Sequence, residues 1–150
     1  MDLKIIKAKE KHIEDVSILF DLYRQFYKYK KDLKNSKNYI YKRLINNESI
    51  IFIAIKNEEI IAFVQLYETF DSLNLSKKLV LYDLYVLDKY RKLGIGRKLM
   101  NKSRDFAKIN KFPRIELSTS INNYNAQKLY ESLDYIRDKE YYDYCLEVLK

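Results

Sequence analysis

The amino-acid sequence predicts an α/β fold in which helices pack against a mixed β-sheet. Apolar residues alternate with polar ones in some segments and recur every three or four residues in others. These segments follow in the order strand, two helices, three strands, helix, strand, helix, strand. The chain has 150 residues, 47% of them hydrophobic, and shows no linker or repeat. We therefore expect one domain over residues 1–150 with a single core, and not a helical bundle or a sandwich.

The first elements are a short strand and two helices. Residues 3–8 (LKIIKA) have the pattern of a strand, and apolar residues recur at helical spacing over residues 13–27. His12 lies at the start of this helix, and we expect it on the surface. We expect the second helix to begin after Ser36 as its N-cap and to bury an apolar face over residues 40–45.

The middle of the chain predicts three strands. Residues 49–70 (SIIFIAIKNEEIIAFVQLYETF) are rich in β-branched and aromatic residues, and a polar turn at Asn57 and Glu58 divides them into a hairpin. Residues 78–88 (KLVLYDLYVLD) form another strongly predicted strand.

The C-terminal third predicts two more helices and two more strands. A helix follows the glycines at 94 and 96, with one apolar side that includes Leu99, Met100, Ser103, Phe106 and Ala107. Residues 114–120 (RIELSTS) read as a strand and residues 122–135 as a helix with Ala126, Leu129, Tyr130 and Leu133 facing inward. Residues 141–149 alternate between apolar and polar, which predicts a closing strand.

Composition limits the possible functions. The net charge of +8 favours anionic partners, such as nucleic acid or a phosphorylated small molecule. One cysteine (Cys145) and one histidine exclude an internal disulfide and disfavour zinc sites and Cys–His or Ser–His nucleophiles, so we expect no metal. The charged N-terminus does not resemble a signal peptide, and the longest apolar run (IIFIAI) is too short to span a bilayer. We expect a cytoplasmic protein without a membrane partner.

The two glycines of the chain, Gly94 and Gly96, predict an anion site. They lie between a strand and the start of a helix, where backbone N–H groups and the helix dipole attract negative charge. Basic residues surround this helix start, although cations there oppose the dipole; these are Arg91, Lys92, Arg97 and Lys98. A bound phosphate group would explain them. The spacing fits neither the dinucleotide fingerprint nor the P-loop, so both nucleotide readings fail.

The pattern R-x-x-G-x-G formed by Arg91, Gly94 and Gly96 resembles the GNAT superfamily of acetyl-CoA-dependent N-acetyltransferases. About 30 residues later, NYNAQKLYE matches that family's N-x-x-A-x-x-L-Y pattern through Asn123, Ala126, Leu129 and Tyr130. The strongest likeness covers residues 79–136, and the element order extends it over nearly the whole chain.

The resemblance implies a GNAT-like mixed sheet of about six or seven strands flanked by four helices, splayed between strands four and five. Acetyl-CoA, as co-substrate, would lie in this opening. The backbone of Leu84, Tyr85 and Val86 would bind the pantetheine arm. Backbone amides of residues 91–97 would cradle the pyrophosphate; these residues are Arg91, Lys92, Leu93, Gly94, Ile95, Gly96 and Arg97. Asn123 and Ala126 would lie at the cofactor arm.

Acetyl transfer to an amine needs a base, an oxyanion donor and an acid. A primary amine with a pKa near 10.4 is protonated at neutral pH and must lose a proton before it attacks. The resemblance implies Tyr130 near the thioester sulfur, where its hydroxyl would protonate the departing thiolate, and an amide near Val86 as the oxyanion donor. Asp83 is the first candidate base, with Glu116 and Tyr82 as alternatives; the other reading of Asp83 is a partly buried carboxylate satisfied by hydrogen bonds. Strand alternation places Asp83 on the face of Leu81 and Tyr85, opposite Tyr82 and Leu84, unless a bulge changes it.

Two residues depart from the family pattern. Lys92 and Asp134 stand where the family commonly has glycine, and we expect Asp134 to adopt an unusual turn conformation.

The leading hypothesis is transfer of an acetyl group to a primary amine of a small molecule or peptide. We expect the acceptor pocket to form from the first two helices, the 67–79 loop and the C-terminal strands, with Glu68 and Asp71 available to attract a cation. The alternatives are a basic nucleic-acid-binding module and a GNAT-like acyl-CoA sensor without turnover. The resemblance also implies a homodimer. The acceptor and the length of the acyl group stay open.

Overall fold

The computed structural model describes residues 2–149, which divide into two compact units, 2–118 and 119–149. Each unit is described by itself.

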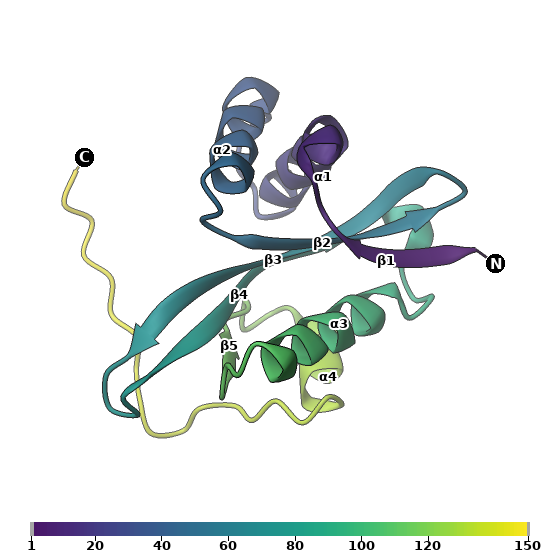
Figure 1. The fold of residues 1–150 in the computed structure, drawn as a ribbon. Helices are drawn as coiled ribbons and strands as arrows, with labels where there is room; N and C mark the ends of the chain where they lie inside the picture. The colour runs from purple at the N-terminus through teal and green to yellow at the C-terminus, as the bar shows by residue number, and fades with distance from the viewer. Residues whose placement is uncertain (1, 150) are drawn as a thin grey trace. The chain divides into compact units, whose positions relative to one another are not determined.

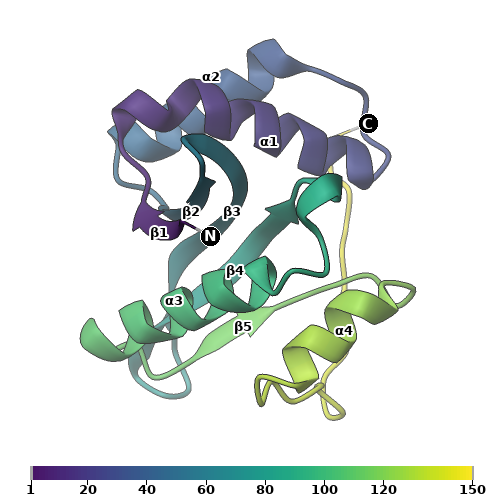
Figure 2. The ribbon, with the colours of Figure 1, turned by 90° about the vertical axis from the view of Figure 1, so that its right-hand side faces the viewer.

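The first unit is a five-stranded sheet covered by helices on both faces (Figure 1). Its strands follow one another in space in the order of the chain, and all pairs are antiparallel except the parallel pair β4–β5. Figure 2 shows α1 and α2 on one side of the sheet and α3 on the other. The strands are β1 (Leu3–Lys7), β2 (Ile50–Lys56), β3 (Glu59–Asp71), β4 (Ser76–Val86) and β5 (Ile115–Leu117), and the helices are α1 (Ile13–Phe26), α2 (Leu33–Ile45) and α3 (Ile95–Ile109).

The centre of the core is β3. Its residues 60–66 are all buried, because helices cover both faces of the sheet. Six of these seven residues are apolar, and the exception is Gln65, which is fully buried. The predicted β2–β3 hairpin is confirmed: Asn57 and Glu58 both take positive φ angles, 49° and 65°, as a tight two-residue turn requires.

Two predictions about the first helices were wrong. The second helix begins earlier, with Asp32 as its N-cap accepting a hydrogen bond from the Asn35 N–H. Ser36 lies inside the helix, buried, and donates to Asp21 Oδ1 at 2.9 Å. His12 is buried instead of exposed, and its Nδ1 accepts the Lys9 N–H at 2.9 Å. In both cases a local hydrogen bond allows a polar side chain to be buried.

The β4 and β5 strands run together over three residues and then separate. Leu79–Leu81 pair with Ile115–Leu117, and within residues 2–118 β4 continues to Val86 with no β5 partner. The predicted opening between the fourth and fifth strands is therefore present in this unit.

The second unit contains α4 (Tyr124–Glu131), which is shorter than the predicted helix. Ala126, Leu129 and Tyr130 are half-buried, and Leu133 lies beyond the helix end. The predicted closing strand was wrong: residues 141–149 contain no strand, and every one is exposed, Cys145 included. Alternating apolar residues suit a strand, but a strand also needs a neighbour for its backbone hydrogen bonds. The described sheet thus has five strands instead of six or seven.

None of the helices described between residues 2 and 149 is long and apolar enough to cross a membrane.

Candidate active site

A β-bulge in the β3–β4 pair determines where Asp83 points. Gln65 pairs with Asp83 and Leu66 pairs with Leu81, so Tyr82 is an extra residue on β4. Paired residues share a face of the sheet, and Gln65 and Leu66 face opposite sides. Asp83 therefore shares the α1 face with Gln65 and not the face of Leu81. The alternation predicted from the sequence was wrong at this point, because the bulge shifts the register by one residue.

Asp83 is a buried carboxylate held by a polar network. Its side chain is buried, and its Oδ2 accepts a hydrogen bond of 2.6 Å from Gln65 Nε2. The other end of that amide is fixed by Ser49, whose Oγ donates to Gln65 Oε1 at 2.7 Å. Burial raises the pKa of Asp83 above its ordinary value, while hydrogen bonds from Gln65 and Tyr23 act in the opposite direction. A carboxyl with a raised pKa is a stronger base when ionised.

The bulge also gives a backbone carbonyl a side-chain partner. The Tyr23 hydroxyl, from α1, donates to the Tyr82 carbonyl oxygen at 3.0 Å. This contact ties α1 to β4 beside Asp83.

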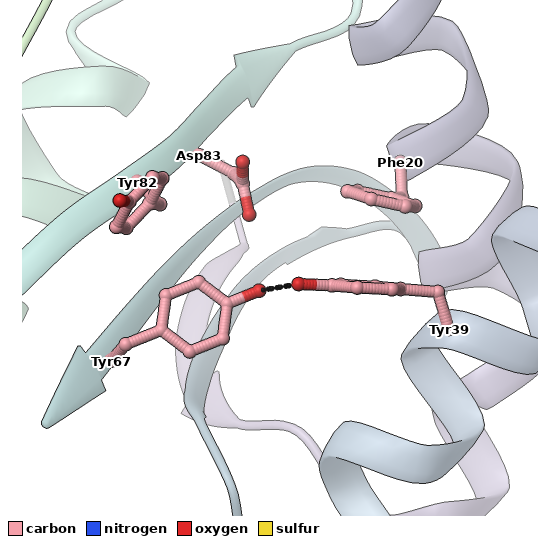
Figure 3. Close-up of a pocket in the computed structure, with 5 residues that line it drawn as sticks. All are labelled: Phe20, Tyr39, Tyr67, Tyr82 and Asp83. Carbon is pink, nitrogen blue, oxygen red and sulfur yellow. Dashed lines mark hydrogen bonds between the residues drawn. The ribbon is translucent and has the colours of Figure 1, made fainter. Parts of the chain in front are cut away.

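Aromatic side chains surround Asp83 on one side, in a cavity of about 380 Å³ (Figure 3). The Phe20 and Tyr39 rings lie nearly parallel, with centroids 5.3 Å apart and planes at 10°. The Tyr39 and Tyr67 hydroxyls lie 2.6 Å apart, and burial raises the pKa of Tyr67 so that it stays a neutral phenol. The lining residues are Phe20, Tyr39, Tyr67, Tyr82 and Asp83.

A second cavity, of about 520 Å³, adjoins the first and shares Phe20 and Asp83 with it. It lies toward the C-terminal end of α1 and adds the residues Tyr23, Arg24, Tyr27 and Tyr29. We call the first cavity the tyrosine pocket and the second the Arg24 pocket. Both lie within residues 2–118.

The β4 edge beyond Asp83 presents alternate backbone groups. The Leu87 N–H donates to the Ile61 carbonyl on β3, so alternation turns the backbone groups of Tyr85 toward β3 as well. The same alternation turns those of Leu84 and Val86 toward the side where β5 has diverged. Of the three predicted pantetheine contacts, Leu84 and Val86 thus have the required backbone direction, and Tyr85 does not.

The glycine loop joins β4 to α3. Gly94 is the N-cap of α3 and has a φ of 75°, in the left-handed region that favours glycine. Lys92 also has a positive φ, 62°, at the position where glycine is the expected residue. The first hydrogen bond of the helix runs from the Lys98 N–H to the Gly94 carbonyl, so Ile95 and Gly96 lie in the first turn, whose N–H groups have no partner within a helix. The four basic residues of this loop, Arg91, Lys92, Arg97 and Lys98, are all exposed.

The Arg91 side chain connects this loop to β4. Its Nε donates to the Val86 carbonyl at 2.9 Å, and its guanidinium pairs with Asp88 at 2.7 Å and lies over the Tyr85 ring at 5.3 Å. Its own N–H donates to the Asp88 carbonyl. Because that amide is occupied, the predicted backbone cradle is corrected to begin at Lys92, with Leu93 next in the loop.

The second unit holds the remaining predicted site residues. Asn123 is the N-cap of α4, where its Oδ1 accepts the Ala126 N–H at 3.3 Å. Tyr130 is half-buried, with its ring 6.1 Å from that of Tyr135. Asp134 has a φ of 68°, so the expected unusual turn conformation is present.

Other acidic candidates are already engaged by cations. Glu116 pairs with Lys78 at 2.7 Å, outside both pockets. Residues 67–79 are mostly strand instead of loop, and their two carboxylates are paired as well. Glu68 pairs with Lys77, and Asp71 accepts from Asn74 Nδ2 at 2.9 Å. Each of these two carboxylates therefore already has a cationic partner, Lys77 for Glu68 and Arg114 for Asp71.

Sequence reasoning missed most of the residues that surround Asp83. Gln65 carried a signal, as the one polar residue in an apolar strand. The pocket aromatics carried none, because each also fits an ordinary amphipathic pattern; they are Phe20, Tyr23, Tyr39 and Tyr67. Within residues 2–149, no group of three or more His, Cys, Asp or Glu side chains is placed to hold a metal ion.

Comparisons with known proteins agree with this geometry. The model of the acetyltransferase (GNAT) family matches residues 16–135. The N-acetyltransferase YhfO of Bacillus subtilis, itself uncharacterized, is 36% identical over 97% of this chain and 98% of its own length. A probable acetyltransferase of Haemophilus influenzae is 32% identical over 82% of this chain and 85% of its own. A crystal structure of a probable acetyltransferase matches with a TM-score of 0.91 and 33% identity, over 98% of this chain and 99% of that one.

Proposed function

The chain belongs to the GNAT family of acetyltransferases, and from this premise we propose that it transfers the acetyl group of acetyl-CoA to a primary amine of a small molecule or peptide. The amine attacks the thioester directly, without an acetylated enzyme intermediate. The composition holds a single histidine and a single cysteine, which disfavours a Cys–His nucleophile and agrees with direct attack.

One observation carries the proposal. A buried carboxylate with a raised pKa, Asp83, opens onto two aromatic cavities and is followed on the same strand by the open edge at Leu84 and Val86. A buried carboxylate and an open backbone edge lie next to each other on β4, which supports the proposal of a base and a cofactor-binding strand at this place.

The chemical roles follow from this placement. Asp83 takes a proton from the ammonium group, directly or through water, which frees the nitrogen lone pair. The Val86 N–H donates to the oxygen that becomes negative as the nitrogen bonds to the carbonyl carbon. The carbon–sulfur bond then breaks, and the Tyr130 hydroxyl gives its proton to the departing thiolate. The extra proton of the amide nitrogen passes through water to the Tyr130 phenolate, and Asp83 releases its proton to solvent. The role of Tyr130 is proposed from the family pattern that it matches.

The cofactor-binding roles are proposed in the same way. Leu84 binds the pantetheine arm through its outward backbone groups; at Val86 the N–H is the group available, because the Val86 carbonyl accepts from Arg91 Nε. The pyrophosphate lies against the loop and first turn from Lys92 to Arg97, where Gly94 shapes the backbone and Gly96 lets it approach closely. Asn123 and Ala126 contact the cofactor arm at the start of α4.

We further propose that both units form one acetyltransferase domain, since the family match at residues 16–135 crosses their boundary. A cytoplasmic location is proposed from the sequence composition, and a homodimer from the resemblance alone. Sedimentation of the purified protein tests the dimer.

Calorimetric titration of the protein with acetyl-CoA tests the proposed function, with dephospho-CoA and NAD as controls for the phosphate contacts. We expect saturable binding of acetyl-CoA, followed by thiol release when a panel of primary amines is added. Absence of binding at submillimolar acetyl-CoA would overturn the proposal.

A further inference from the structure

The charges that line the two pockets differ in sign and in position. Among the described residues that line them, Asp83 is the one acidic group and Arg24 the one basic group. Asp83 is shared by both pockets, whereas Arg24 lines only the Arg24 pocket. A ligand that extends from Asp83 into that pocket meets an anion first and a cation further on.

Arg24 is placed to bind an anion. Its guanidinium lies 5.5 Å from the centre of the Tyr29 ring, and its side chain is 29% exposed. Its two hydrogen bonds, to Asp21 Oδ1 and to the Lys30 carbonyl, are both long at 3.4 Å. A guanidinium has five N–H donors, so these contacts leave capacity for a carboxylate.

The Asp21 carboxylate, which forms an ion pair with Arg24 at 3.4 Å, has further hydrogen-bond donors. Its carboxylate accepts shorter hydrogen bonds from the Asp32 N–H at 2.9 Å, from Ser36 Oγ at 2.9 Å and from Gln25 Nε2 at 3.0 Å. Arg24 also contributes to lowering the pKa of Asp32, after the hydrogen bonds from Asn35, so its charge faces two carboxylates, and its long contacts leave N–H donors available.

The segment next to Arg24 adds to the positive potential. Residues 24–31 carry four cationic side chains and no acidic one; the cations are Arg24, Lys28, Lys30 and Lys31. This potential opposes the entry of a polycation and favours an acceptor with an anionic group.

On the basis of the proposed function, we propose that the acceptor is a small amine that also carries a carboxylate, such as an amino acid with an amine in its side chain. The reacting ammonium lies at Asp83 against the faces of Phe20 and the tyrosines, which attract cations. The aliphatic part runs along Tyr23 and Tyr27, and the carboxylate pairs with Arg24. Arg24 is thereby a residue that determines acceptor specificity.

Matched amines that differ only in the carboxylate test this inference. The probes are L-lysine against L-lysinamide and L-ornithine against L-ornithinamide, which also vary the chain length. Each is measured by calorimetric binding to the protein and by acetyl-transfer kinetics. In the wild type, we expect at least one acid to bind more tightly than its amide, by roughly tenfold to a hundredfold for a charge-assisted pair.

Arg24→Gln should abolish that preference: it should raise KM for the acid, with kcat and the KM for the amide nearly unchanged. Arg24→Lys should retain part of the preference. Arg104→Gln is the control, because it removes the same charge from an exposed side chain on α3 whose hydrogen bond to Asn101 is 3.2 Å long. Equal binding of each acid and its amide, no binding of any probe, or equal effects of the two glutamine variants would overturn the inference.

Calorimetry measures binding of the probes without acetyl transfer. Failure of the inference about Arg24 is therefore distinguishable from failure of the proposed function. That function fails when acetyl-CoA itself does not bind.

Discussion

Gln65 Nε2 donates a hydrogen bond of 2.6 Å to Asp83 Oδ2 across the bulge between β3 and β4. The pair joins the centre of the core to the candidate base, because Gln65 is fully buried and Asp83 opens onto both pockets. Since Ser49 fixes the orientation of the Gln65 amide, the carboxylate is held in place by two residues that line neither pocket.

Replacement of Asp83 by Asn should remove the base and lower kcat/KM by roughly 10²–10⁴-fold. The same variant should be more stable than the wild type at neutral pH. Burial raises the pKa of Asp83, so the folded state favours the protonated carboxyl, and this preference is lost as pH rises through the folded pKa. Asn is neutral at every pH. The difference in folding free energy between Asp83→Asn and the wild type should therefore vanish in acid, where Asp83 is protonated.

Thermal melting at several pH values and steady-state kinetics check both effects, with Asp105→Asn on the exposed side of α3 as the control. Full activity of Asp83→Asn would move the role of base to Tyr82 or Glu116.

Replacement of Gln65 by Met should shift the acidic limb of the pH–rate profile to higher pH. The Gln65 hydrogen bond lowers the pKa of Asp83, so its loss lets burial raise that pKa further. Met fills a similar volume without a donor, and the unpaired partners should cost about 1–3 kcal/mol of folding free energy. Ser49→Ala keeps the amide but frees its orientation and should give a smaller shift in the same direction. A folded Gln65→Met protein with an unmoved profile would contradict the positioning role.

The features that were predicted correctly from the sequence are those that depend on local sequence patterns. The order of elements up to the last helix, the hairpin at Asn57 and Glu58 and the glycine turn at the start of α3 follow from periodicity and turn chemistry, and the structure confirms them. The family pattern also explains two strained positions, because Lys92 and Asp134 stand where glycine is common and both take positive φ angles.

The predictions that were wrong in the sheet concern features that depend on pairing between strands. The bulge at Tyr82 arises from the register of β3 against β4, and it reversed the predicted relation of Asp83 to Leu81. Residues 141–149 have a strand pattern without a paired neighbour. The aromatic pockets combine residues from α1, α2, β3 and β4, and no local pattern distinguishes them from core residues.

Replacement of each glycine by alanine should separate the requirements of the fold from those of the ligand. Gly94 has a φ of 75°, and a Cβ there would meet no atom within 4 Å, so Gly94→Ala should cost about 1–2 kcal/mol through backbone strain alone. Gly96 lies in α3 without a positive φ, so alanine there should stabilise the protein by about 0.5–1 kcal/mol. Under the proposed binding mode, Gly96→Ala should nevertheless weaken acetyl-CoA binding, by roughly tenfold, because the pyrophosphate is proposed to approach this backbone closely.

Melting temperatures and acetyl-CoA calorimetry read the two effects separately. Unchanged acetyl-CoA affinity in a stabilised Gly96→Ala protein would contradict close approach of the pyrophosphate at that residue.

Replacement of Tyr130 by Phe should lower kcat by roughly 10²–10⁴-fold while acetyl-CoA binds as tightly as before, because only the hydroxyl is lost. Tyr124→Phe, at an exposed position of the same helix, is the matched control and should be silent. The defect should depend on pH: a thiol has a pKa of about 8.5, so above that pH the thiolate departs without needing a proton. The ratio of wild-type to Tyr130→Phe rates should therefore shrink between neutral and alkaline pH. A defect that is constant over this range would instead indicate that Tyr130 positions the cofactor and does not donate the proton.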